Sequence, residues 1–321
     1  MTTRIDFLGK SAGLFLALVF LLPSLAVAAS ISVNCNAGDT IKGALPKLKP
    51  GDKLVVSGTC VENVAVGGAS APNGQFDGIT LDGQGTATIS GPDSSTNTLE
   101  LWSVRNFTIK GFRITGGRDG IVVNAGQVVG IENNTIEQVG RHGISVQRGT
   151  TLAHVKNSVI QNNPGNGIVV NEASYVRIGF GSVVEATEGD TGANTIQGNG
   201  GEGVRLQRAS MARILLNTIR NNGSNGVLVE KLSYAEIASN IIEGNAQDGV
   251  RATQNSGVLL GQDTGTGNEN RPNDTGTPNR KCGVEISLGA YVDGRLGSLT
   301  GISGAMCGST EMDYPINSLI P

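Results

Sequence analysis

The feature that most constrains the fold of this chain is an internal repeat. A glycine followed by a β-branched run recurs in steps of 23, 24, 36, 23, 23 and 34 residues. These glycines are Gly120, Gly143, Gly167, Gly203, Gly226, Gly249 and Gly283. Such a period is typical of solenoids, in which each repeat packs only against its neighbours. The two longer steps predict an insertion in each of those repeats.

Three short segments follow one another in each repeat. The first begins at the glycine, as in GIVV at 120–123, and its alternate residues are apolar. The second holds pairs such as Val129 and Ile131, and the third places an isoleucine among polar residues, as in NTIEQV at 134–139. Alternation with a period of two is typical of strands with one buried face. We therefore predict an all-β chain that forms a single-stranded parallel β-helix of about ten triangular coils.

Asparagine recurs at two of the bends. One expected column is Asn134, Asn194, Asn217 and Asn240, interrupted by Ser158; the other is Asn163, Asn199, Asn222 and Asn245. Stacked amides at one height per coil would form hydrogen-bonded ladders with a structural role. A leucine-rich repeat has a similar period and an asparagine ladder. The Ile/Val/Gly/Asn pattern and the lack of helical periodicity after residue 50 favour the β-helix.

Residues 1–29 have the pattern of a secretory signal peptide, which leaves 30–321 as one β-helix domain. Arg4 and Lys10 precede a short apolar run, and small residues at 26–29 offer a cleavage site. The run is too short for a comfortable membrane span, so we expect no span after cleavage and a periplasmic or secreted protein. The net charge of −3 argues against a nucleic-acid surface.

The four cysteines form two pairs with a spacing of one coil. Cys35 and Cys60, like Cys282 and Cys307, lie 25 residues apart. Adjacent coils stack about 4.8 Å apart, which is within disulfide reach. We predict two disulfides, one near each end, and no zinc site, because no pair has zinc-ligand spacing. Residues 39–48 (DTIKGALPKL) are expected to form a short helix that caps the N-terminal coil.

The segments at 38–66 and 79–89, with the Gly-Ile-x-Val and Asn-x-Ile repeats, resemble the pectin-lyase-like right-handed β-helix superfamily. In its repeat pattern the chain is similar to periplasmic β-helix proteins, including the copper-binding type that helps nitrous-oxide reductase mature. The resemblance implies a right-handed helix, but it leaves function open, because this fold hosts lyases, hydrolases, epimerases, adhesins and binding proteins. Copper sites favour His, Met and Cys, and this chain has two His and four Met.

Our preferred candidate site is the residue before each repeat glycine. These residues are Asp119, His142, Asn166, Glu202, Asn225 and Asp248, with Arg118, Arg141, Arg205 and Arg251 beside them. We expect them to form one column on the outside of the β-helix. Asp119 and His142 resemble the placement of catalytic groups in polygalacturonase-like hydrolases, but the adjacent Asp pair and the Arg-x-Lys motif of those enzymes are missing. Glu202 and Asp248, two coils or about 9.6 Å apart, come nearest to an inverting carboxylate pair.

A second candidate column lies on the middle strand and contains His154, Arg177 and Arg213, with Lys156 beside the histidine. A lyase or epimerase needs a base beside a uronate carboxylate and cations that neutralise that carboxylate. Either His142 or His154 could be the base, with neighbouring arginines as the cations. The alternative interpretation of both columns is that they are solvated faces of the β-helix.

The two insertions are rich in oxygen ligands. They contain Glu185, Glu188 and Asp190 in one, and Asp263, Asn268, Glu269, Asn270 and Asp274 in the other. Such side chains suit calcium, although no calcium-loop spacing is present, and no other cofactor is expected. The leading hypothesis is a non-catalytic protein that binds an extended, acidic polysaccharide along its side. The alternatives are a polysaccharide lyase or C5-epimerase, and a periplasmic accessory protein with a protein partner.

Overall fold

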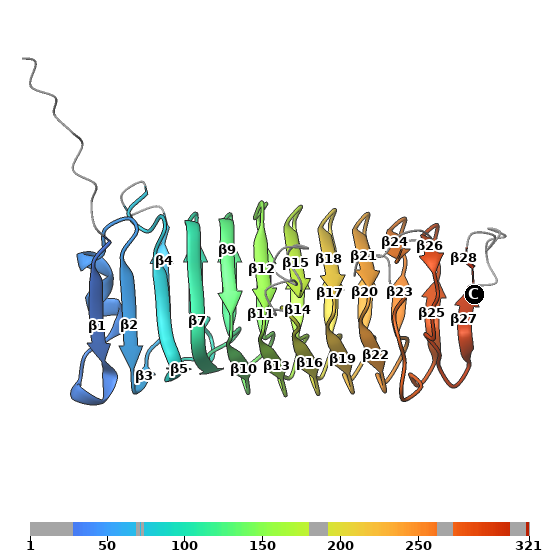
Figure 1. Cartoon of the computed structure of the whole chain (residues 1–321), viewed down its shortest axis with the longest axis horizontal. Coiled ribbons are helices and arrows are strands. Elements are labelled where there is room, and N and C mark those ends of the chain that lie inside the picture. The colour runs from blue at the N-terminus through green and yellow to red at the C-terminus, as the bar shows by residue number, and fades with distance from the viewer. Residues whose placement is uncertain are drawn as a thin grey trace, which may run out of the picture.

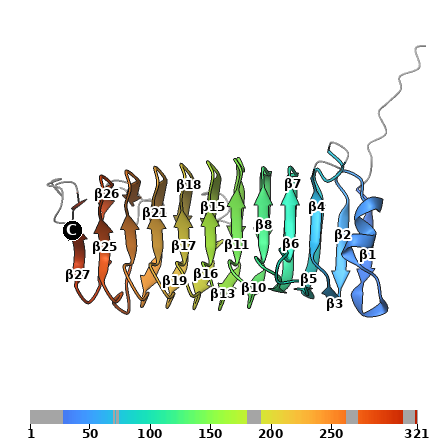
Figure 2. The same cartoon turned by 180° about the vertical axis from the view of Figure 1, so that it is seen from behind.

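The chain forms one solenoid of parallel strands stacked along a single long axis (Figure 1). This computed structural model describes residues 28–68, 71, 74–179, 192–261, 272–308 and 319–320. The N-terminal and C-terminal coils lie at opposite ends of the stack, as both views show (Figures 1 and 2). Each coil has three faces, which we name the first, second and third face in the order in which the chain reaches them after a repeat glycine.

The first face is a ten-stranded parallel sheet in the described part of the chain, as the repeat predicts. Its strands are β4 (Val64–Gly67), β6 (Leu99–Trp102), β8 (Ile121–Asn124), β11 (Ile144–Gln147), β14 (Ile168–Val170), β17 (Val204–Leu206), β20 (Val227–Val229), β23 (Val250–Ala252), β25 (Cys282–Ile286) and β27 (Gly304–Gly308).

The second and third faces share one larger sheet, because β5 (Thr80–Gly91) and β7 (Arg105–Gly116) run through both. The other strands of the second face are β1 (Ser30–Asn34), β2 (Lys53–Ser57), β9 (Gln127–Glu132), β12 (Ala153–Lys156), β15 (Tyr175–Gly179), β18 (Met211–Leu215), β21 (Tyr234–Ala238), β24 (Gly257–Leu260), β26 (Tyr291–Arg295) and β28 (Leu319–Ile320). The other strands of the third face are β3 (Thr59–Val61), β10 (Thr135–Glu137), β13 (Val159–Gln161), β16 (Thr195–Gln197), β19 (Thr218–Arg220) and β22 (Ile241–Glu243).

The core consists of columns of like residues, because the register places equivalent positions of successive coils side by side. Ile121, Ile144 and Ile168 are partners on the first face, and all three are fully buried. Ile136 and Ile160 are partners on the third face and are buried as well. The alternation of apolar residues in the sequence therefore corresponds to side chains that point into the solenoid.

The repeat glycines are required by close packing. A Cβ atom on Gly120 would lie 2.6 Å from the carbonyl oxygen of Gly143 and 2.6 Å from Cγ2 of Ile136. Gly203 would meet Ile219 and Gly226 in the same way. These distances are far below van der Waals contact, so a side chain at this position would force adjacent coils or faces apart.

Both predicted asparagine ladders are confirmed. In the first, the side-chain amide of Asn194 donates to Oδ1 of Asn217 at 2.9 Å, and Asn217 donates to Asn240 at 3.0 Å. Ser158 occupies the interrupted rung and accepts the backbone N–H of Asn134. The second ladder runs from Asn163 through Asn199, Asn222 and Asn245, and Asn273 and Asn279 extend the two ladders by one coil each.

A hydroxyl ladder that the sequence analysis missed lies at the third bend, between the first and second faces. Each hydroxyl accepts the backbone N–H of the equivalent residue one coil earlier, at 3.2–3.3 Å. The rungs are Thr150, Ser174, Ser210, Ser233 and Ser256, and all are buried. Each of the three bends thus has its own polar ladder, which satisfies backbone groups that would otherwise be buried without partners.

A short helical segment closes the N-terminal end, as predicted (Figure 2). It comprises η1 (Cys35–Ala37), α1 (Ile41–Ala44) and η2 (Leu45–Lys47). The buried carboxylate of Glu62 accepts the backbone N–H groups of Ile41 and Lys42, at 2.7 and 3.1 Å, and so attaches α1 to the second coil. The predicted signal peptide falls almost entirely on residues 1–27, which lie outside the described residues. No helix in the described ranges is long and apolar enough to cross a bilayer.

Both predicted disulfides are present. Cys35 pairs with Cys60 and Cys282 pairs with Cys307, with Cα–Cα distances of 5.0 and 6.0 Å. Each bond joins neighbouring coils, and the two bonds lie near opposite ends of the stack.

Candidate functional site

The residues that precede the repeat glycines do form a column in register. This column is a fourth hydrogen-bond ladder and not an open site. Asp119 accepts the backbone N–H of His142, and Nδ1 of His142 accepts the N–H of Asn166 at 3.0 Å. The side chains of Asn166, Asn225 and Asp248 do the same, and each accepts the backbone N–H of the equivalent residue one coil later. The expectation of an exposed column is wrong for four of its six members, because Asp119, Asn166, Asn225 and Asp248 are at most 4% exposed. Their side chains turn toward the next coil to satisfy its backbone.

Asp119 is held as a buried carboxylate. Arg141 binds both of its oxygens, at 2.6 and 2.8 Å, and the Ser145 hydroxyl lies 3.4 Å away. Burial alone would raise the pKa of Asp119, but the hydrogen bonds from Arg141 and from the backbone of His142 outweigh it and lower the pKa. A fully engaged, 1% exposed carboxylate is poorly placed to exchange protons with a ligand.

His142 is a neutral structural histidine. Its pKa is lowered to about 4, mainly by burial. The nearby charges of Arg141, Arg205 and Arg118 also lower the pKa, whereas Asp119 raises it. Because Nδ1 accepts a backbone N–H, the ring proton of the neutral form sits on Nε2. Neither nitrogen then has a lone pair available to remove a substrate proton.

We expect His142 to make the protein lose stability as the pH falls from about 6.5 to about 4. In this window the unfolded chain binds a proton at the histidine and the folded chain does not, so protonation favours unfolding. The loss should be roughly 2 kcal/mol after allowance for partial solvent screening. The measurement is the melting temperature against pH for the wild-type protein and for His142→Gln. Identical slopes for the two proteins between pH 6.5 and 4.5 would contradict this prediction.

The other candidates on the first face are held in local pairs. Arg118 donates to Asn97 through Nε, Ser224 donates to Glu202, and Arg205 pairs with Glu230. Glu202 and Asp248 therefore do not face each other across an open site, as an inverting hydrolase would require.

Asp248 has a different carboxyl neighbour, Glu285 of the next coil. Burial raises the pKa of Glu285, and the nearby carboxyl group of Asp248 raises it further. Arg251 pairs with Glu285 at 3.1 Å, and Oδ2 of Asp248 has no hydrogen-bond partner within the described ranges. The two carboxyl groups are thus close neighbours in a mostly buried position. This pair was not predicted, because Glu285 follows the 34-residue step and is distant from Asp248 in the sequence.

The second candidate column is confirmed as a column. His154, Arg177 and Arg213 are register partners on β12, β15 and β18, and Glu236 of β21 follows them. Arg213 donates to the Glu236 carboxylate at 2.8 and 3.3 Å. All four side chains project from the second face. This face therefore has a row formed by His154 and two arginines, in which neighbouring side chains lie on adjacent coils about 4.8 Å apart.

A hollow of about 270 Å³ lies at the start of this column. Gly130 on β9 is the register partner of both Thr108 and His154, and it places no side chain between them. A Cβ atom there would lie 3.1 Å from Oε1 of Glu132 and 3.2 Å from Oγ1 of Thr108. The hollow is lined by Asn106, Thr108, Val128, Val129, Gly130, Glu132, His154 and Lys156. A salt bridge of 3.8 Å joins Lys156 to Glu132 in its wall. His154 and Lys156 were predicted as site residues, whereas the missing side chain at Gly130 was not.

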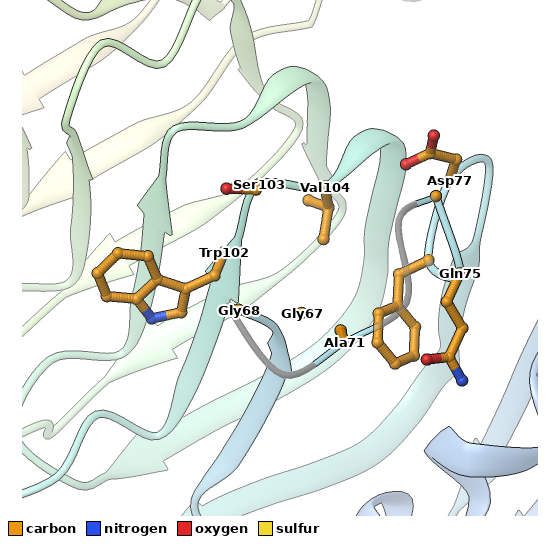
Figure 3. Close-up of a pocket in the computed structure, with 10 residues that line it drawn as sticks. Gly67, Gly68, Ala71, Gln75, Asp77, Trp102, Ser103 and Val104 are labelled. Atoms are coloured by element: carbon orange, nitrogen blue, oxygen red, sulfur yellow. The ribbon is translucent and has the colours of Figure 1, made fainter.

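A second cavity, of about 50 Å³, lies near the N-terminal coils and is too small for a sugar ring. Figure 3 shows the Trp102 side chain on one side of it and Gln75 on the other. The Trp102 ring is instead covered by Arg148, whose guanidinium carbon is 5.0 Å from the ring centre. This contact is a cation–π interaction between coils.

The predicted oxygen ligands of the insertions lie outside the described residues, apart from Asp274, which accepts a hydrogen bond from Ser298. In the described ranges, one group of metal-ligand residues is tightly clustered: Cys35, Cys60 and Glu62. Its two sulfurs form a disulfide and its carboxylate binds α1, so these groups do not fit a metal ion.

Comparison with known proteins identifies the architecture. Residues 54–189 and 183–291 match the family model described as "Right handed beta helix region". A pectate lyase structure, Pel9A, has a TM-score of 0.54 with 14% identity over 84% of this chain and 78% of its own. The mannuronan C-5 epimerase AlgE6 A-module of Azotobacter vinelandii has a TM-score of 0.47, with 16% identity over 88% and 89% of the two chains. An alginate lyase from Paenibacillus sp. str. FPU-7 has a TM-score of 0.39, with 17% identity over 87% and 99%. A search of curated proteins found no match.

Proposed function

Since this chain belongs to the right-handed β-helix family, we propose that it is an exported protein that binds an extended, acidic polysaccharide along its second face. The observation that carries the proposal is the hollow at Gly130, with His154 and Lys156 in its wall. A shallow hollow on a long, flat face suits a chain that lies across the surface, with one sugar unit seated more deeply than the others.

The charge on this face supports an acidic ligand. From β5 to β21 the basic side chains that point outward are Lys110, Lys156, Arg177 and Arg213, and they outnumber the acidic ones. The three acids pair with them: Asp82 with Lys110, Glu132 with Lys156 and Glu236 with Arg213. Cations with a regular spacing along a rigid sheet can meet carboxylates that repeat along a polymer, at little cost in ordering the protein.

Two further observations support the class of ligand and the location. A protein of the same fold is named as a pectate lyase, that is, for an acidic polysaccharide. The two disulfides suit an oxidising compartment outside the cytoplasm.

The test is binding of the purified protein to polygalacturonate and alginate, with dextran as the neutral control, followed by affinity gel electrophoresis with and without calcium. We expect both acidic polymers to retard the protein. Gly130→Ile, which fills the hollow without changing the charge, should weaken binding about tenfold, as should the pair Lys156→Ala and Arg177→Ala.

Arg220→Ala is the matched control, because Arg220 is an outward arginine of the third face that pairs with Gln197. Equal losses in Arg220→Ala and in the second-face variants would indicate non-specific charge attraction and would overturn the proposal.

A uronate lyase or epimerase is the second candidate, and the position of His154 in the wall of the hollow favours it over the same chemistry at His142. A lyase would produce unsaturated uronates, which absorb in the ultraviolet, and an epimerase would change the sugar signals in NMR spectra. Either signal, lost in His154→Ala with the fold intact, would replace binding by catalysis as the function of this face.

A further inference from the structure

A row of aromatic and apolar side chains, partly or largely exposed, runs beside the cation column on the second face. Tyr175, Met211 and Tyr234 are register partners on β15, β18 and β21, followed by Gly257 of β24 and Tyr291 of β26. Met211 is 50% exposed and Tyr291 is 57% exposed. The row lies two residues before the cation column on the same strands, so both rows point to the same side of the sheet.

Tyr291 lies flat against the sheet. A Cβ atom on Gly257 would overlap the Cζ and hydroxyl oxygen of the Tyr291 ring, so this ring covers the Gly257 backbone. Gly257 itself is buried, whereas more than half of Tyr291 is exposed. One face of the ring therefore rests on the backbone and the other faces solvent. The absence of a side chain at Gly257 makes this arrangement sterically possible.

Tyr234 completes a two-ring platform. It lies two coils before Tyr291, which leans toward it over Gly257. Burial raises the pKa of Tyr234, and the nearby Tyr291, Glu236 and Asp293 raise it further. The charges beside the platform are thus acidic, because Glu236 and Asp293 follow the two tyrosines on the same strands.

We propose that Tyr234 and Tyr291 form a stacking site for a neutral pyranose ring. The inference rests on the proposed function, because the site would take a neutral unit of a polysaccharide whose acidic units lie over Lys156, Arg177 and Arg213. A flat, exposed aromatic ring favours the C–H face of a sugar. The carboxylate of Asp293 repels uronates and accepts hydrogen bonds from neutral sugar hydroxyls.

The test uses wild-type protein, Tyr291→Ala, Tyr291→Phe and Tyr234→Ala, titrated with hexasaccharides of glucose, mannose, galactose or xylose. Binding is followed by tyrosine fluorescence and by NMR saturation transfer. At least one neutral hexasaccharide should bind the wild type. Tyr291→Ala and Tyr234→Ala should weaken that binding about tenfold or more, whereas Tyr291→Phe, which keeps the ring, should change it less than about threefold. The control is Leu232→Ala, a 69% exposed apolar residue at a bend, which should have no effect.

The two proposals can fail separately. Neutral binding that needs Tyr291, in a protein that does not bind polygalacturonate or alginate, would support the platform and overturn the acidic function. Acidic binding that needs Lys156 and Arg177, with no neutral hexasaccharide bound, would overturn the platform and leave the acidic function intact. Equal weakening by Tyr291→Ala and Leu232→Ala would also overturn the platform.

Discussion

Replacement of Asn217 by leucine is expected to lower the free energy of unfolding by about 4 kcal/mol. Asn217 is 1% exposed and accepts both the backbone N–H and the side-chain amide of Asn194. It also donates to the carbonyl oxygen of Ile178 and to Asn240. Leucine has a similar size but can replace none of these bonds, so several buried polar groups would lose their partners at once. Urea denaturation followed by far-ultraviolet circular dichroism measures the loss.

The chain itself offers a matched control, because Ser158 already occupies the equivalent rung. A serine at that position accepts the preceding backbone N–H at 3.1 Å. Asn217→Ser should therefore retain about half of the stability that the leucine variant loses. If leucine and serine destabilise the protein equally, the cost comes from packing and not from the ladder.

Removal of the Cys35–Cys60 bond is expected to cost about 3.5 kcal/mol in the chain-entropy model, because the bond closes a loop with a sequence separation of 25. The double variant Cys35→Ala and Cys60→Ala should show this loss in the first coils. Coils of a solenoid contact only their neighbours, so distant coils should respond much less. Hydrogen exchange followed by mass spectrometry resolves the two regions.

The pair Cys282→Ala and Cys307→Ala is the matched control, since it has the same separation at the other end of the stack. Its faster exchange should appear near β25 and β27. If either double variant raised exchange uniformly along the chain, the stack would unfold as one unit and the local prediction would be wrong.

Strand order, register and both disulfides could be predicted from the sequence because they depend on spacing alone. Coils of constant length place Ile121 beside Ile144, whatever the neighbouring side chains do. The asparagine ladders follow the same rule, since amides at one position of each coil must stack. The period of the sequence is therefore sufficient to predict the strands, their register and the asparagine ladders that repeat along the axis.

Exposure was harder to predict, because it depends on which way a side chain turns between coils. Asp119 precedes a glycine in an apparently outward position, yet its carboxylate turns to the backbone of His142 and is buried. The serine ladder was missed although Ser174, Ser210 and Ser233 occur at one place in the repeat. A small hydroxyl residue before a strand is also typical of an ordinary solvated turn, so its burial is not evident from residue type.

The features of the second face that we consider functional depend on missing side chains. Gly130 opens the hollow and Gly257 seats Tyr291, and both glycines fall on strands where a side chain would be usual. The signal was present as a tyrosine at one repeat position, in Tyr175, Tyr234 and Tyr291. Charged residues two positions later in the same strands carry a stronger pattern, so the tyrosine row is not evident from the sequence alone.

The ladders also bear on how such a chain can change over generations. Ser158 bonds to Asn194 across a gap of 36 residues, and Asn240 bonds to Asn273 across 33, yet both bonds resemble those that span 23. The rungs therefore tolerate added chain between them, provided that it leaves and re-enters at a bend. A lineage with this architecture can acquire new loops, or whole coils, by insertion and duplication while the framework keeps its stability.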